Sequence, residues 1–215
     1  MLSFAPATGD LPRNPGVMTL CAISLDRETG ITVTKGVVTM GKLEDKVAFI
    51  TGAARGQGRR HAIRLAQEGA DIIAVDITEQ VATVPYATAG PGDMEQTVKE
   101  VEALDRRIIA SEADVRDLAA LRKAADDGVA ALGRLDIVLA NAGISTMSPT
   151  IEMEEEMWDT MIDINLTGVW KTVRAAVPHI VAGGRGGSVV LTSSLAAIIA
   201  CLLYTSPSPP RLGMI

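Results

Sequence analysis

The residues best suited to chemistry form a glycine-rich stretch between an apolar run and a helical period. The stretch starts at Thr51 and contains Gly52, Arg55, Gly56, Gln57 and Gly58. A nucleotide pyrophosphate needs free backbone N–H donors and a close approach of the main chain. The start of a helix supplies such donors, and glycines remove the side chains that would block the approach. The succession of strand, turn and helix therefore predicts a dinucleotide site here.

A carboxylate at the end of the next apolar run indicates which dinucleotide is held. Asp76 closes the run and stands 18 positions after Gly58. A carboxylate there accepts hydrogen bonds from the adenosine ribose of NAD, and it repels the additional phosphate of NADP. Arg55 argues the other way, because a basic side chain in the glycine-rich stretch can accept that phosphate. We give Asp76 the greater weight, since it occupies the expected strand end, and we predict NAD as the cofactor.

A sheet must position these residues, and the middle of the chain alternates short β-rich runs with helical periods. We expect five strands, at Val47–Thr51, Asp71–Asp76, Arg107–Val115, Leu135–Ala140 and Ser188–Thr192. We expect helices at Gly58–Glu68, Glu95–Leu104, Asp117–Leu132 and Glu154–Val181, the last strained near Pro178. Continuous apolar strands between helices indicate a parallel sheet covered on both faces. The predicted fold is α/β, an incomplete doubly wound parallel sheet of the Rossmann type with about five strands.

The connection Thr78–Asp93 is polar and rich in proline and glycine. It separates the second predicted strand from the following helix. A loop of this length is either functional or mobile, and the sequence leaves both alternatives open.

Further motifs follow the glycine-rich stretch in order. They are Ala113-Asp114-Val115, Asn141-Ala142-Gly143, Asn165 and Ser193-Ser194. Together with the Thr-Gly-x-x-x-Gly-x-Gly spacing, they resemble the short-chain dehydrogenase/reductase family over roughly Leu43 to Ala197. The resemblance implies that Asp114 contacts the adenine ring, with Val115 beside it. It also implies that the cofactor site is lined by Asn141, Ala142 and Gly143, and by Ile77 next to Asp76.

The closer resemblance is to mycofactocin-associated members of that family, which include carveol-dehydrogenase-like enzymes. It rests on Gly52–Arg59, Asp71–Ile77, the inserted Val84-Pro85-Tyr86 loop and Gly168–Val173. It implies tightly held NAD, a secondary alcohol or ketone as the small-molecule substrate, and an external redox acceptor. Such relatives often form tetramers, so we expect the parent enzyme to be a homo-oligomer.

The family's reaction removes a hydride and a proton from a secondary alcohol, with a tyrosine as the base. The resemblance assigns Ser194 to hold the substrate oxygen and Asn165 to support a water. The family places its tyrosine thirteen positions after the serine, where this chain has Pro207. The nearby Tyr204 is followed four positions later by Ser208 rather than by lysine, so we reject it as the base.

Three functions follow from these motifs. The resemblance predicts an NAD-dependent oxidoreductase that interconverts a secondary alcohol and a ketone. A catalytically inactive dinucleotide-binding fragment is the alternative that the missing Tyr-x-x-x-Lys motif favours. An NADPH-dependent 3-oxoacyl reductase is a further alternative, which Asp76 disfavours.

The two ends of the chain differ from its middle. Residues 1–39 carry no sustained period, and we interpret them as a disordered extension or an upstream mis-start, with a short strand at Ile31–Val38. Residues 40–200 form a partial NAD-binding domain that lacks later strands. Residues 201–215 look non-native, because Cys201–Pro209 resembles a translated sequencing adapter. The fifth strand would then be an uncovered edge, and we predict a poorly soluble product.

Composition argues against several other classes of protein. The 215 residues include 20 Lys and Arg against 26 Asp and Glu, and the net charge of −6 argues against a nucleic-acid partner. The longest apolar run, Leu195–Tyr204, is too short to span a bilayer, so we expect no membrane partner. Cys21 and Cys201 give neither a disulfide framework nor metal-ligand spacing. We therefore expect no metal site and a cytoplasmic location.

Overall fold

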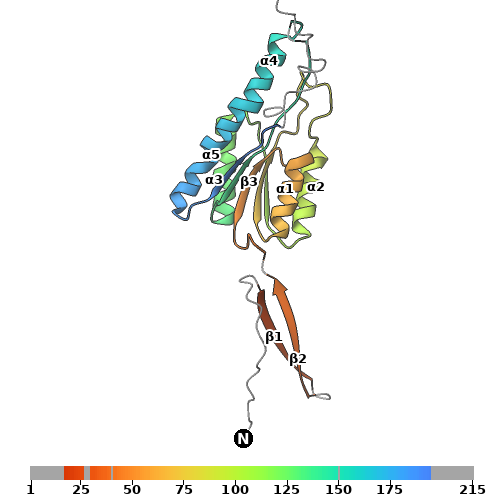
Figure 1. Cartoon of the computed structure of the whole chain (residues 1–215), viewed down its shortest axis with the longest axis vertical. Coiled ribbons are helices and arrows are strands. Elements are labelled where there is room, and N and C mark those ends of the chain that lie inside the picture. The colour runs from red at the N-terminus through yellow and green to blue at the C-terminus, as the bar shows by residue number, and fades with distance from the viewer. Residues whose placement is uncertain (1–16, 27–29, 40, 150, 195–215) are drawn as a thin grey trace, which may run out of the picture.

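The computed structural model describes residues 17–26, 30–39, 41–149 and 151–194, which form two separate sheets (Figure 1). The smaller sheet pairs β1 (Val17–Asp26) with β2 (Gly30–Thr39) in antiparallel register. The strand expected at Ile31–Val38 lies inside β2. The sequence does not predict its partner β1, because that segment lacks a strict alternation of apolar and polar residues. The interpretation of residues 1–39 as an extension stays a prediction.

The larger sheet contains five strands where the sequence predicts them, although the third ends at Glu112 rather than at the expected Val115. They are β3 (Val47–Thr51), β4 (Asp71–Asp76), β5 (Ile108–Glu112), β6 (Ile137–Ala140) and β7 (Ser188–Leu191). Their order is β5-β4-β3-β6-β7, and every neighbouring pair is parallel. The chain builds outward from β3 to one edge and then returns to build the other side. Ligands of such sheets bind beyond the carboxyl ends of the strands, where this reversal opens a crevice.

Helices cover both faces of this sheet. α1 (Gly56–Gln67) and α2 (Pro91–Glu102) lie on one face, while α3 (Leu118–Leu132) and α5 (Gly168–Gly183) lie on the other (Figure 1). Alternate residues of the central strands divide between two cores. Phe49 and Ile73 belong to the core that includes α3 and α5 residues, whereas Ile50 and Ile72 belong to the core that includes α1 residues. The predicted doubly wound α/β fold is confirmed.

The long helix expected over Glu154–Val181 contains an irregular turn. α4 (Glu155–Ile162) continues into the π-helical turn η1 (Asp163–Thr167) and then into α5. The helix runs through Pro178, where we expected the strain. Its departure from α-helical geometry lies at η1 instead, and η1 carries Asn165. Single π-helical turns of this kind are frequent at functional sites.

α2 begins one turn earlier than the expected start at Glu95. Asp93 explains this difference, because its carboxylate accepts a hydrogen bond from the Gly90 N–H at 2.9 Å and caps the helix. Pro91 then occupies the first turn, where its missing N–H costs no helical hydrogen bond. The expectation was wrong because a Pro-Gly pair in the sequence indicates a loop.

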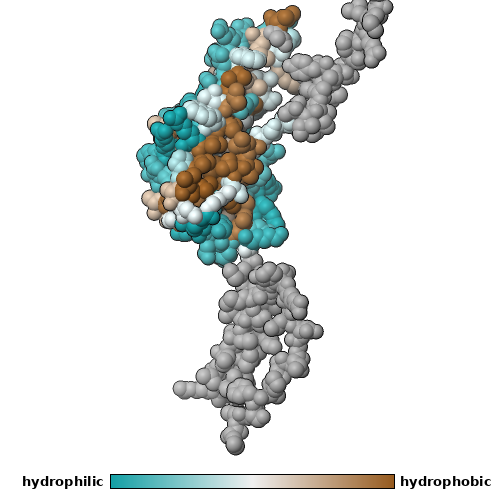
Figure 2. All heavy atoms as spheres, turned by 60° about the vertical axis from the view of Figure 1, so that its left-hand side comes forward, coloured by the Kyte–Doolittle hydropathy of each residue, from teal (hydrophilic) through white to brown (hydrophobic). Residues whose placement is uncertain are grey.

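β7 is the outer strand on one side of the sheet, and its side chains are poorly covered. Val189, Val190 and Leu191 are 44%, 49% and 54% exposed. Figure 2 shows an apolar patch, bordered by hydrophilic side chains, on this side of the molecule. Within the part of the chain that the structure describes, no strand pairs with the outer edge of β7, and the uncovered edge expected from the sequence stays a prediction. Among the described residues, no helix combines the length and the apolar character that a membrane span requires.

Candidate functional site

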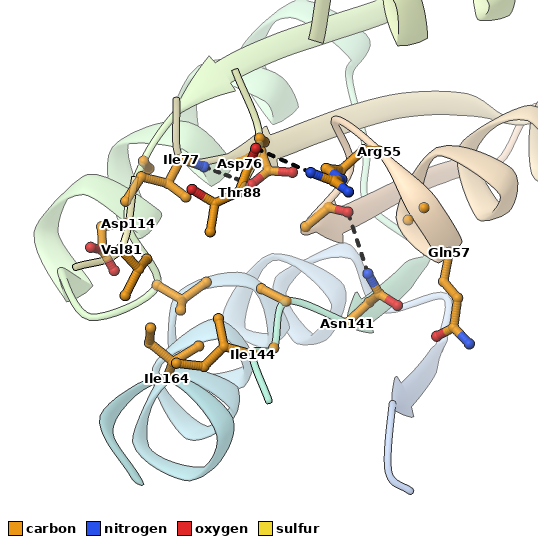
Figure 3. A pocket seen from close by; sticks show the side chains of 18 of the residues that line it. Arg55, Gln57, Asp76, Ile77, Val81, Thr88, Asp114, Asn141, Ile144 and Ile164 are labelled. Atoms are coloured by element: carbon orange, nitrogen blue, oxygen red, sulfur yellow. Dashed lines mark hydrogen bonds between the residues drawn. The ribbon is translucent and has the colours of Figure 1, made fainter. Parts of the chain in front are cut away.

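A pocket of about 300 Å³ lies at the carboxyl ends of β3, β4 and β6 (Figure 3). Every residue that the sequence assigned to cofactor binding lines it: Gly52, Arg55, Gly56, Gln57, Gly58, Asp76, Ile77, Asp114, Val115, Asn141, Ala142 and Gly143. The remaining lining residues were not singled out as site residues: Val81, Tyr86, Ala87, Thr88, Ala89, Ala113, Ile144 and Ile164. Motifs from four connections of the chain therefore meet in one cavity.

The glycine-rich turn between β3 and α1 needs its glycines for two different reasons. A Cβ on Gly58 would lie 1.9 Å from the Gly52 carbonyl oxygen, so only glycine fits there. Gly56 has a φ of +56°, a left-handed conformation that favours glycine, and a Cβ there would meet nothing within 4 Å. The turn is thus tight on its inner side and open at Gly56. An open backbone at a helix start is the arrangement that admits an anionic group.

Asp76 ties this turn to the end of β4. Its carboxylate accepts hydrogen bonds from the backbone N–H groups of Ala54 and Ile77, each at 2.8 Å. The residue is only 9% exposed. Burial raises the pKa of Asp76 above its ordinary value, and the two N–H donors oppose that rise. The carboxylate is therefore both a brace for the turn and an acceptor that lines the pocket.

Arg55 forms hydrogen bonds with the connection that follows β4. Its Nη1 donates to the carbonyl oxygens of Ala87 and Thr88, at 2.6 and 3.1 Å. These bonds hold the connection against the glycine-rich turn (Figure 3). They give Arg55 a role in holding this connection in place.

The connection Thr78–Asp93 folds over the pocket and is held there by side chains. The Gln80 side-chain amide donates to the carbonyl oxygens of Val81, Val84 and Tyr86. The hydroxyl of Tyr86 accepts a hydrogen bond from the Ser145 N–H at 2.9 Å, which joins the loops that follow β4 and β6. Of the two alternatives left open by the sequence, the structure favours a functional loop, because its residues line the pocket.

Asp114 is paired with Arg116 at the far side of the pocket from Gln57 (Figure 3). Burial alone would raise the pKa of Asp114, but the Arg116 side chain and backbone N–H outweigh it and hold that pKa below its ordinary value. The carboxylate is therefore ionised under ordinary conditions. Arg116 had no role in the sequence interpretation, although its position two residues after Asp114 makes such a pair feasible.

Asn141 joins three neighbouring strand ends. Its side-chain Nδ2 donates to the Thr51 carbonyl oxygen at 3.0 Å, and its Oδ1 accepts from the Thr192 hydroxyl at 3.3 Å. The Thr51 hydroxyl in turn accepts from the N–H groups of Asn141 and Ala142. These bonds fix the floor of the pocket. Thr51 is a positioning residue whose role the sequence did not reveal, because its partners lie about 90 positions away.

The two residues that the sequence assigned to catalysis do not line the pocket. Asn165 Oδ1 accepts from the Ile144 N–H at 2.9 Å, and its Nδ2 donates to the Ile144 carbonyl at 2.8 Å. Asn165 thus holds the backbone next to Gly143. Ser194 is exposed and follows β7, two positions beyond the Thr192 that bonds to Asn141. Tyr204 and Pro207 lie outside the described residues.

The described residues also contain no cluster of His, Cys, Asp and Glu that could hold a metal ion. The pocket offers backbone donors, the carboxylates of Asp76 and Asp114, the Arg55 guanidinium and apolar walls. This combination fits a nucleotide better than it fits an ion.

Comparisons with known proteins agree with this geometry. The family model for short chain dehydrogenase matches residues 46–206. A (−)-trans-carveol dehydrogenase from Rhodococcus erythropolis is 54% identical over 74% of this chain and 58% of its own length. The crystal structure of a carveol dehydrogenase from Mycobacterium avium in complex with NAD has a TM-score of 0.73 at 55% identity, over 75% of this chain and 58% of that one.

A second solved structure gives the same result. A short chain dehydrogenase from Mycobacterium paratuberculosis bound to NAD has a TM-score of 0.72 at 57% identity, over 74% of this chain and 59% of that one. The chain thus spans less than three fifths of the length of these relatives. The match over residues 46–206 covers all motifs described above. This chain belongs to the short chain dehydrogenase family.

Proposed function

We propose that the pocket binds NAD and that the protein is an NAD-dependent oxidoreductase. The observation that carries this proposal is the buried carboxylate of Asp76 beside an open helix start. Asp76 can accept hydrogen bonds from ribose hydroxyls, while the backbone around Gly56 and Gln57 receives the pyrophosphate. The open space at Gly56 is where a bulky anion would fit. The NAD complexes of the two mycobacterial relatives support the same assignment.

NAD accepts a hydride when it is bound. The chain's own residues have to bind the alcohol and accept the proton of its hydroxyl group. We assign Ser194 to hold the substrate oxygen. Asn165 keeps Ile144 and Gly143 in place through its two backbone hydrogen bonds. Arg55 and Tyr86 hold the loop Thr78–Asp93 over the pocket, which excludes water from one side of it.

Preference for NAD over NADP follows from charge. A 2′-phosphate placed beside Asp76 would meet a carboxylate that is mostly removed from water, and like charges repel strongly in such surroundings. The Arg55 guanidinium keeps its charge and offsets part of this repulsion, but its bonds to the carbonyl oxygens of Ala87 and Thr88 fix its position. The NADPH-dependent 3-oxoacyl reductase is therefore the weaker alternative.

The substrate that we propose is a secondary alcohol, oxidised to a ketone. The carveol dehydrogenases among the relatives support an alcohol of this class. Tight retention of NAD would require an external redox acceptor to regenerate it, and the bonds of Arg55 and Tyr86 across the pocket support slow release. A homo-oligomeric state, a cytoplasmic location and a mycofactocin-linked acceptor remain predictions.

A second candidate is an NAD-binding unit without turnover. The observation that favours it is the absence of a Tyr-x-x-x-Lys motif from the sequence. The family's reaction uses the tyrosine of this motif to take the alcohol proton, so this candidate binds NAD and does not turn over the alcohol.

One experiment separates these candidates. NAD and NADP are titrated separately into the purified 215-residue chain. Reduction of a redox dye is then followed with carveol as the alcohol, NAD as the bound hydride acceptor and the dye as the final electron acceptor. NAD binding at least about tenfold tighter than NADP, with turnover, supports the oxidoreductase. NAD binding without turnover supports the second candidate, and the absence of NAD binding contradicts both.

A further inference from the structure

Arg59 lies in α1 and does not line the pocket, yet its side chain holds the glycine-rich turn. Its Nε donates to the Ala54 carbonyl oxygen at 2.9 Å, and its Nη2 donates to the same oxygen at 2.6 Å. Both nitrogens of one planar guanidinium edge therefore converge on one backbone oxygen. A charged donor in this forked geometry forms a stronger and more directional bond than a neutral one does.

Thr97 of α2 reinforces the same contact from the other side. Its side chain is completely buried, and its Oγ1 lies 3.1 Å from the Ala53 carbonyl oxygen and 3.0 Å from the Ala54 carbonyl oxygen. The hydroxyl accepts a hydrogen bond from Arg59 Nε at 3.0 Å, so its own proton is left for one of three carbonyl oxygens, those of Ala53, Ala54 and Asp93. The two side chains form one bonded unit around Ala54.

Ala54 is thus held from both ends. Its N–H donates to the Asp76 carboxylate, and its carbonyl oxygen accepts from Arg59. In a trans peptide the N–H points away from the C=O, so the carbonyl of Ala54 sets the direction of the next N–H, that of Arg55. Because Arg59 draws the carbonyl toward α2, it turns the Arg55 N–H the opposite way.

Arg59 also ties the turn to the start of α2. Its Nη2 donates to the Asp93 carbonyl oxygen at 2.8 Å and reaches the Asp93 carboxylate at 3.2 Å. The same carboxylate caps α2 through the Gly90 N–H. The Arg59 guanidinium therefore links the glycine-rich turn to the first turn of α2, where the loop over the pocket ends.

We infer that Arg59, with Thr97, is a positioning residue for the cofactor site, which fixes the Ala54 peptide so that Asp76 and the Arg55 N–H face the bound dinucleotide. The inference rests on the proposed function, because it assigns a role toward NAD. Arg59 acts through Ala54 and Asp93 and does not touch the cofactor itself. Its removal should weaken NAD binding beyond any loss of folding stability.

Arg106 provides a matched control at the opposite end of the sheet. Like Arg59, it is partly buried and bonds both a carboxylate and a backbone carbonyl, here Glu44 at 3.0 Å and Gly69 at 2.8 Å. It stands near Asp71, where β4 begins, whereas the pocket lies where β4 ends at Asp76. Loss of Arg106 should therefore lower the folding stability and leave NAD binding in the pocket unchanged.

The test compares Arg59→Met, Arg59→Lys and Arg106→Met in the 215-residue chain. Methionine keeps much of the apolar stem and removes the donors, while lysine keeps the charge and removes the fork. Two quantities are measured for each variant. One is the midpoint of thermal unfolding without ligand, and the other is the Kd for NAD at a temperature where circular dichroism shows the variant to be folded.

We expect Arg59→Met to raise the Kd for NAD about tenfold and Arg59→Lys to give an intermediate value. Arg106→Met should lower the unfolding midpoint about as much as Arg59→Met does. It should leave the Kd for NAD within about twofold of the wild type. The inference is overturned if folded Arg59→Met binds NAD as the wild type does, or if Arg106→Met weakens binding equally. Failure of the wild type to bind NAD would instead contradict the proposed function.

Discussion

The carboxylate of Asp76 accepts a hydrogen bond from the Ala54 N–H at 2.8 Å, which joins the end of β4 to the turn after β3. The two residues are 22 positions apart, and the bond is buried. Adjacent parallel strands bring their carboxyl ends to one edge of the sheet, so this bond closes the site between them. The acid to which we attribute a preference for NAD is thereby the acid that braces the turn.

The substitution Asp76→Asn should reduce the preference for NAD. The amide keeps the size of the side chain and removes the charge that repels a 2′-phosphate. It also takes the acceptor from one of the two backbone N–H groups that the carboxylate binds, those of Ala54 and Ile77. We expect NADP binding to improve about tenfold and NAD binding to weaken about threefold, measured by titration calorimetry. Asp127→Asn, at an exposed acid of α3, is the charge-matched control and should change neither Kd. An unchanged ratio of the two affinities in Asp76→Asn would contradict the role of this carboxylate.

The two glycines of the turn should respond differently to alanine. Gly58→Ala places a Cβ 1.9 Å from the Gly52 carbonyl, so the turn must open, and NAD binding should be lost together with about 3 kcal/mol of stability. Gly56→Ala meets no atom and has only its left-handed backbone to oppose it, at a cost of about 1 kcal/mol. Urea unfolding measures both values. Equal losses of unfolding free energy in the two variants would show that the close contact at Gly58 does not determine the stability of the turn.

Tyr86→Phe should speed the release of NAD. The change removes the acceptor of the Ser145 N–H bond and leaves the ring in place, so only the link across the pocket is lost. We expect the dissociation rate to rise about fivefold, measured by displacement with excess unlabelled NAD in stopped flow. Ser148→Ala removes an exposed hydroxyl that bonds only to Pro149 among the described residues, and it should leave the rate unchanged. If NAD dissociates from Tyr86→Phe as fast as from the wild type, the hydrogen bond between Tyr86 and Ser145 does not slow NAD release.

Asp136 should stabilise the fold in a pH-dependent way. Burial works against its ionised form, but the Arg134 side chain and the Val47 N–H outweigh burial and hold the pKa of Asp136 below its ordinary value. A lowered folded-state pKa gives stability that is present above the unfolded pKa and is lost as the pH falls through the folded one. Asp136→Asn should therefore cost about 2 kcal/mol at pH 7 and much less at about pH 3.

Urea unfolding of the wild type and of Asp136→Asn at the two pH values measures this difference. Lys123 and Asp127 form an exposed pair on α3, so Asp127→Asn serves as the control and should cost little at either pH. The same loss at pH 7 and pH 3 in Asp136→Asn would contradict the electrostatic origin of its stabilisation.

The sequence predicts the sheet well because its strands are buried on both faces. Asp71–Asp76 is a continuous apolar run between charged ends, and β4 has the same bounds. The pocket was predictable for a related reason, since parallel strands place the residues after them at one edge. Gly52, Asp76 and Asn141 each follow or end such a strand, and all three line the cavity.

Contacts that depend on helix packing could not be predicted in this way. Arg59 and Thr97 lie 38 positions apart and meet only because α2 packs beside α1. Tyr86 and Ser145 lie 59 positions apart and meet through the path of an irregular loop. The π-helical turn at Asn165 also has no sequence signal, because one additional residue per turn does not change the spacing pattern enough to be recognised.

The most direct test of the NAD site is amide hydrogen exchange of the purified chain with and without saturating NAD. The structure predicts slower exchange in peptides that cover the glycine-rich turn from Thr51 to Gly58, and in those that cover Ile77 to Tyr86. Peptides over β7 and over the start of β4 should exchange at unchanged rates. Exchange that NAD leaves unaltered in the turn, or slows only elsewhere, would contradict the assignment of this pocket to NAD.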